Sequence, residues 1–102
     1  MSPESTLERV GTIFADLASL IEARKPADLI QRALADLTTV CAQASAQKQA
    51  GAAQELLRNV STAVQTWEQV WPRLGQQPEF RLAVAREARM WAKRFQELGQ
   101  RP

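Results

Sequence analysis

Histidine and tyrosine are absent from this chain of 102 residues, and cysteine occurs once, at Cys41. Without histidine, the chain lacks the side chain that most often serves as a general base and as a metal ligand. A single cysteine cannot form an intrachain disulfide, a Cys–His catalytic pair or a thiolate zinc site. The sequence also has no glycine-rich phosphate-binding loop. We therefore expect no enzymatic activity, no metal site and no cofactor.

Long apolar runs are missing as well. No stretch approaches the roughly 20 apolar residues that a membrane-spanning helix needs. The first residues, MSPESTLERV, lack the basic segment followed by an apolar run that marks a secretory signal. Together with the single cysteine, these absences predict a cytoplasmic protein without a membrane span.

The residues that are abundant favour helix. Glycine occurs only 4 times, hydrophobic residues make up 45% of the chain, and Ala, Gln, Leu and Arg are frequent. A chain of this length has room for one hydrophobic core. We expect a single helical-bundle domain over residues 1–102.

Apolar residues recur at intervals of three and four along four segments, as they do on one side of an α-helix. The clearest stripe lies in the stretch 56–72 and includes Trp67 and Trp71. Prolines and glycines set the expected ends: Lys25-Pro26 and Pro72 interrupt helices, and Gly99 stops the last one. The predicted helices cover about residues 5–24, 26–48, 52–71 and 79–98, and the loop with the clearest turn signals covers residues 72–78.

Four such stripes predict an all-α protein, a four-helix antiparallel up-down bundle with short loops. Residues 45–54 contain no large apolar side chain, and Gly51 there is expected to end the second helix in a left-handed conformation. The alternative is a three-helix form in which helices two and three fuse into one long helix that dimerises to cover its stripe. Small residues at Gly11, Ala15 and Ala18 predict a close helix crossing, inside the domain or with a partner chain.

Positive charge is concentrated in the last third of the chain. Residues 73–102 carry seven bases and three acids, a balance of +4, whereas residues 1–25 and 26–72 each carry −1. On the last helix, Arg86, Arg89 and Lys93 cluster opposite the apolar stripe, where they would meet an anionic partner or simply face solvent. Trp71, beside the 72–78 loop, is expected to be partly exposed and to contact another chain.

The predicted function is a small non-enzymatic protein–protein interaction module, an adaptor, regulator or assembly subunit that acts through a helix face, either alone or as a homodimer. The candidate partner-binding residues are Trp71, Arg86, Arg89 and Lys93. One alternative is a nucleic-acid-binding accessory protein that uses the basic C-terminal helix. A further alternative is a bundle that binds an apolar ligand or lipid between its helices. Cys41 lies on an apolar stripe and is expected to be a small buried hydrophobe.

Overall fold

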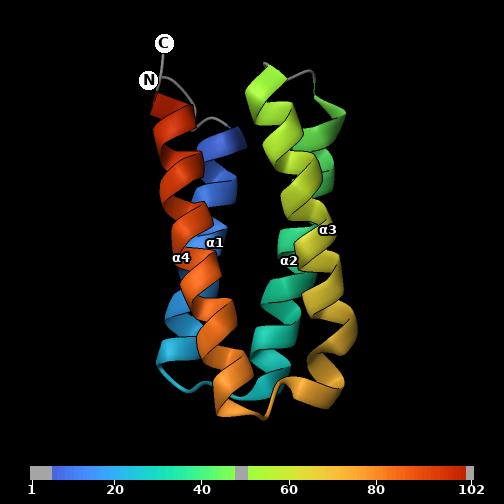
Figure 1. Cartoon of the computed structure of the whole chain (residues 1–102), viewed down its shortest axis with the longest axis vertical. Helices are drawn as coiled ribbons and strands as arrows, with labels where there is room; N and C mark the ends of the chain where they lie inside the picture. The colour runs from blue at the N-terminus through green and yellow to red at the C-terminus, as the bar shows by residue number, and fades with distance from the viewer. Residues whose placement is uncertain (1–5, 48–50, 101–102) are drawn as a thin grey trace.

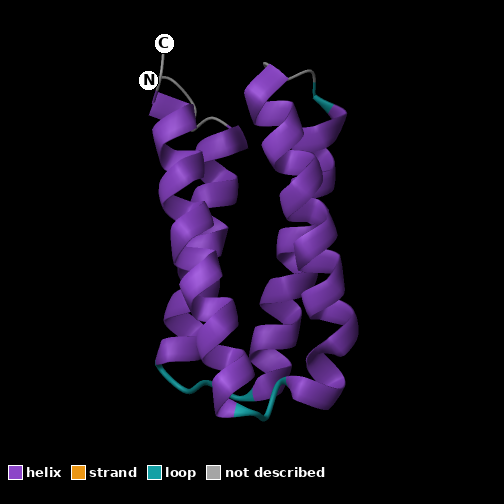
Figure 2. Ribbon diagram, in the orientation of Figure 1, coloured by secondary structure: helices purple, strands orange, loops and turns teal. Residues whose placement is uncertain are grey.

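The computed structural model describes residues 6–47 and 51–100, and these residues form four α-helices and no strand (Figures 1 and 2). The helices are α1 (Thr6–Glu22), α2 (Ala27–Ala46), α3 (Gly51–Leu74) and α4 (Pro78–Gln100). They run alternately up and down, so the start of α1 and the end of α4 lie at the same end of the bundle. The predicted four-helix up-down bundle is confirmed. The fused alternative is wrong, because α2 ends at Ala46 and the next residue, Gln47, is extended.

The helices associate in two close pairs, α1 with α4 and α2 with α3, which meet mainly through α1 and α2 (Figure 1). Small residues allow the first pair to come close. A Cβ atom on Gly11 would lie 3.0 Å from the carbonyl oxygen of Ala92 and 3.3 Å from the backbone nitrogen of Gln96. Ala18 on α1 and Ala88 on α4 are buried. The small residues of α1 therefore serve a crossing inside the domain.

One hydrophobic core draws on all four helices. The rings of Phe14 on α1 and Phe95 on α4 stack inside it, with centroids 5.9 Å apart. Cys41 is fully buried in the core, as the sequence predicts, and no polar or charged side chain of the described residues is buried. Each large apolar side chain removed from water contributes roughly 1.5–3 kcal/mol to folding. The four predicted apolar stripes therefore face the core, and the opposite sides of the helices are left for contacts with other molecules.

Pro72 does not end α3, which continues to Leu74, so the predicted loop over residues 72–78 shrinks to residues 75–77. A proline inside a helix cannot donate an N–H to the carbonyl four residues earlier. Here that carbonyl belongs to Glu68, and it accepts a hydrogen bond of 3.2 Å from Nε2 of Gln31 on α2. Because a neighbouring helix supplies the missing donor, the helix passes through the proline.

The other predicted helix ends also shift. Gly51 begins α3 instead of ending α2, and it does not have a positive φ. α4 passes Gly99 and ends at Gln100. The left-handed residue of the described chain is Arg24, with φ 58°, just after α1. Its N–H donates to the carbonyl of Ile21, and the N–H of Lys25 donates to that of Leu20, the pattern that closes many helices. The predicted start of the first helix, at about residue 5, lies outside the described residues.

Candidate functional site

The outward side of α4 carries four exposed side chains at spacings of four, four and three residues: Leu82, Arg86, Met90 and Lys93. We call these four residues the α4 outer face. Leu82 is 54% exposed and Met90 47% exposed. In the described part of the chain one other large hydrophobic residue is similarly exposed, Leu29 on α2, at 40%. Two of the three therefore lie on the same strip of one helix, interleaved with bases.

The two bases of the α4 outer face have no acidic partner among the described residues. Within residues 6–47 and 51–100, neither Arg86 nor Lys93 forms an ion pair. Glutamates lie further along the same side of the helix, Glu79 before the face and Glu97 after it. Along this side of α4 the middle is thus positive and apolar, and one glutamate lies toward each end.

Arg89, the third predicted base, is bound to α1. Its guanidinium donates to the carboxylate of Glu22 and, over 3.3 Å, to the hydroxyl of Ser19. The hydrogen bond from Arg89 lowers the pKa of the Glu22 carboxyl, and the same bond raises the pKa of Arg89. Both side chains remain about half exposed. Arg89 therefore links α1 to α4. Its charge is already paired with Glu22 and is less available to a partner than the charges of Arg86 and Lys93.

Trp71 is not a surface contact. Only 2% of its area is exposed, and its Nε1 donates to the backbone carbonyl of Ala27 over 3.0 Å. The ring of Phe80 lies 5.7 Å away, centroid to centroid. The expected exposure of Trp71 was wrong because α3 continues for three more residues, which keeps the indole inside the bundle. Trp71 joins the start of α2 to the end of α3.

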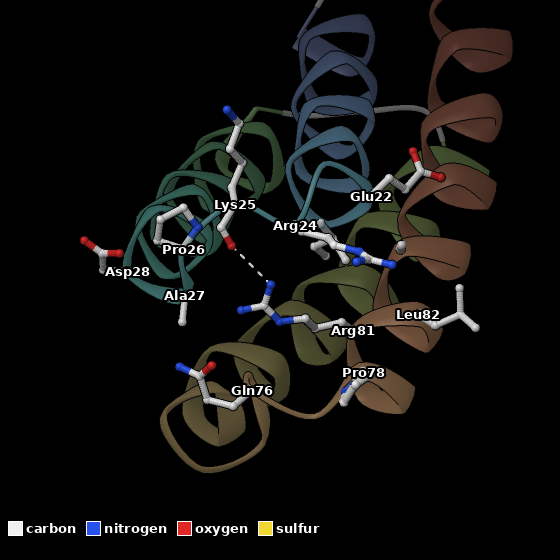
Figure 3. Close-up of a pocket in the computed structure, with 12 residues that line it drawn as sticks. Glu22, Arg24, Lys25, Pro26, Ala27, Asp28, Gln76, Pro78, Arg81 and Leu82 are labelled. Carbon is white, nitrogen blue, oxygen red and sulfur yellow. Dashed lines mark hydrogen bonds between the residues drawn. The ribbon is translucent and has the colours of Figure 1, made fainter.

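A hollow opens at the end of the bundle where the α1–α2 and α3–α4 connections meet (Figure 3). Near its centre, Nη1 of Arg81 donates to the carbonyl of Lys25 over 3.1 Å, and Nε donates to the carbonyl of Gly75. The guanidinium carbon lies 5.6 Å from the centre of the Trp71 ring. The residues that line the hollow are Ile21, Glu22, Arg24, Lys25, Pro26, Ala27, Asp28, Gln76, Pro78, Arg81, Leu82 and Ala85.

Nothing in the local sequence distinguishes Arg81 from the other bases of the last helix. Its carbonyl partners lie 6 and 56 residues away along the chain. No local pattern indicates such a meeting of two loops, so the hollow had no signal in the sequence.

Reactive groups are scarce in the part of the chain that the structure describes. Burial raises the pKa of the Cys41 thiol to about 11, so the thiol stays protonated near neutral pH. In residues 6–47 and 51–100 no three acidic or cysteine side chains come together in a group that could hold a metal ion. None of the described helices has the length and apolar character needed to cross a membrane.

The sequence matches no protein-family model, and no curated protein or solved structure is significantly similar to it.

Proposed function

We propose that this protein is a small non-enzymatic interaction module that binds another protein through the α4 outer face. The observation that carries the proposal is the alternation of exposed Leu82 and Met90 with the unpaired bases Arg86 and Lys93. Exposed apolar side chains next to unpaired charge are typical of surfaces that a partner covers. The partner that fits best is an amphipathic helix with acidic residues beside its apolar ones.

The charge of the α4 outer face and its exposed apolar side chains favour a protein partner over nucleic acid. Phosphate binding grows with the number of free bases, and the α4 outer face offers two. Glu79 and Glu97 at its ends would repel a phosphate backbone. Leu82 and Met90 would gain little from phosphates, whereas an apolar partner surface would remove them from water.

The scarcity of reactive side chains among the described residues supports the non-enzymatic part of the proposal. The one thiol, Cys41, is buried and protonated, and no polar side chain of the described core is buried in a position to act as an acid or base. The proposal includes a reducing compartment such as the cytoplasm, where this thiol stays reduced.

Site-specific photo-crosslinking in the native host tests the proposal. A photoreactive amino acid replaces Met90 in one version and Arg58, an exposed residue of α3, in the control version. We expect a discrete protein adduct from position 90 only, and we expect Arg86→Glu with Lys93→Glu to abolish it. An adduct of twice the chain's mass would identify a second copy as the partner and would be checked by light scattering.

Three outcomes would contradict the proposal. Equal labelling from both positions would mean that the α4 outer face is an ordinary solvated surface. Absence of any adduct from position 90 would mean the same. An adduct that nuclease digestion removes would favour the nucleic-acid alternative, and that alternative also predicts binding to duplex or single-stranded nucleic acid that weakens steeply with salt.

A further inference from the structure

Arg81 is held in place more firmly than a surface arginine usually is. Its Nε and Nη1 groups donate to the carbonyls of Gly75 and Lys25, one from each connection, and its guanidinium lies over the Trp71 ring. An arginine side chain loses much conformational freedom when it binds an anion. Here three contacts have already fixed the side chain, so a ligand would not need to order it.

The fixed guanidinium still has unused donors. An arginine carries five N–H groups, and two of those on Arg81 reach protein carbonyls. The other three have no acceptor among the residues that the structure describes. Figure 3 shows the guanidinium lying between the turn at Lys25–Ala27 and the side chain of Gln76, inside the hollow. Such a planar group with free N–H groups suits a carboxylate.

The charges around the hollow leave it positive. Arg24, Lys25 and Arg81 line it, with the acids Glu22 and Asp28. Glu22 is already paired with Arg89, and the carboxylate of Asp28 points away from Arg81 in Figure 3. The first turn of α2 also borders the hollow without a side-chain cap, which adds weakly to the positive potential.

The rest of the lining is largely apolar. Ile21 and Ala85 are buried beneath the hollow, Pro26 and Pro78 form its sides, and Leu82 stands exposed at its edge. An inorganic anion would leave these surfaces in water. A carboxylate with a short apolar chain would cover them while its head group meets Arg81.

We propose that this hollow is a binding site for a small monoanionic carboxylate that carries a short alkyl chain. The head group accepts hydrogen bonds from the free N–H groups of Arg81, and the chain lies against Pro78 and Leu82. The site differs from the α4 outer face, with which it shares only Leu82, and it does not depend on the proposed function.

Titration of the labelled protein with sodium octanoate, followed by amide NMR shifts, tests the site. Octanol and sodium acetate serve as probes that lack the charge and the chain. We expect octanoate to shift the amides of Lys25, Gln76 and Leu82 and to bind about tenfold more tightly than either comparison probe. Octanol binding as tightly as octanoate would overturn the proposal, as would the absence of any shift at these amides.

Variants separate binding from folding. Arg81→Lys keeps the charge but loses the planar fork, and we expect about tenfold weaker octanoate binding. Because Arg81 also ties the two connections together, Leu82→Ala provides a second test at an exposed position. Leu82→Ala should weaken octanoate binding and leave acetate binding unchanged. The matched variant Leu29→Ala, outside the hollow, should change the binding of neither probe. Equal effects of the two leucine variants would overturn the proposal. Arg86→Glu with Lys93→Glu, which removes the proposed protein contact, should leave octanoate binding intact.

Discussion

Gln31 on α2 donates a hydrogen bond of 3.2 Å from its Nε2 to the backbone carbonyl oxygen of Glu68 on α3. The residue four positions after Glu68 is Pro72, which has no N–H to offer this carbonyl. The hydroxyl of Thr38 also donates to Oε1 of Glu68, over 2.9 Å. A half-buried carbonyl that proline would leave unpaired is thus satisfied across the α2–α3 pair.

This relationship predicts a coupling between Gln31 and Pro72. Gln31→Ala should lower the free energy of unfolding by about 1–2 kcal/mol, because it leaves the carbonyl of Glu68 without a donor. In a Pro72→Ala background the loss should be smaller, since the new backbone amide at position 72 can donate instead. Urea denaturation of the four proteins of this double-mutant cycle measures the difference. Gln43→Ala, an exposed glutamine on the same helix, is the control. Equal losses in both backgrounds would contradict this role.

Arg24 occupies a backbone conformation that glycine adopts at no cost. Its φ of 58° strains an L-residue by roughly 1–2 kcal/mol. Arg24→Gly should therefore unfold at higher urea concentration than Arg24→Ala, by about 1 kcal/mol in stability. Both variants remove the same exposed charge, so their difference reports the relieved strain less the extra chain entropy that glycine loses on folding. An alanine variant more stable than the glycine variant would contradict a strained left-handed conformation at this position.

Gly75 packs closely against both the indole and the backbone carbonyl of Trp71. A Cβ atom there would lie 2.6 Å from the carbonyl oxygen of Trp71 and 2.7 Å from its Nε1. We expect Gly75→Ala to cost about 1–3 kcal/mol of stability, because the indole is held by its bond to Ala27 and cannot easily shift. Gly51→Ala is the matched comparison, since nothing lies within 4 Å of a Cβ there. It should be neutral or slightly stabilising by thermal denaturation, and the opposite ranking would refute the close contact.

The ion pair between Glu22 and Arg89 makes part of the stability depend on pH. The pKa of the Glu22 carboxyl is lowered in the folded protein by its hydrogen bond to Arg89. The contribution of this ion pair to stability is therefore present above the ordinary glutamate pKa, and it is lost as the pH falls through the lowered pKa of Glu22. Arg89→Gln should raise the Glu22 midpoint in an NMR titration, and Arg58→Gln should leave it unchanged. Identical midpoints in the wild type and in Arg89→Gln would show that the pair does not form in solution.

Cys41 should make stability depend on pH in the opposite sense, so that stability is lost as the pH rises. Burial raises the pKa of its thiol from 9.0 to about 11, so the unfolded chain loses the thiol proton at a lower pH than the folded one. Between these values, stability should fall by up to about 1.4 kcal/mol per pH unit relative to Cys41→Ala. The chain has no tyrosine to titrate in this range. Urea denaturation of both proteins from pH 8 to 11 gives the difference, and parallel curves would mean that the thiol is accessible.

The sequence by itself determined the helices and the sides that they bury. Apolar spacing is a local property, so the stripes containing Leu34, Val64 and Phe95 could be assigned before any contact was known, and all three residues are fully buried. The same reasoning placed Arg86 and Lys93 on the outside, where the structure has them. Their role in binding stays a prediction.

Only the tertiary structure decided whether a helix continues through a helix-breaking residue and which charged side chains have a partner on another helix. Pro72 is a local stop signal, but Gln31, 37 residues before Glu68, supplies the missing donor and carries α3 onward. That continuation buried Trp71. Arg89 is matched by Glu22, 67 residues away, and Arg81 is fixed by two separate connections. Hydrogen bonds and ion pairs of this kind depend on which helices become neighbours, and periodicity along one helix contains no information about that.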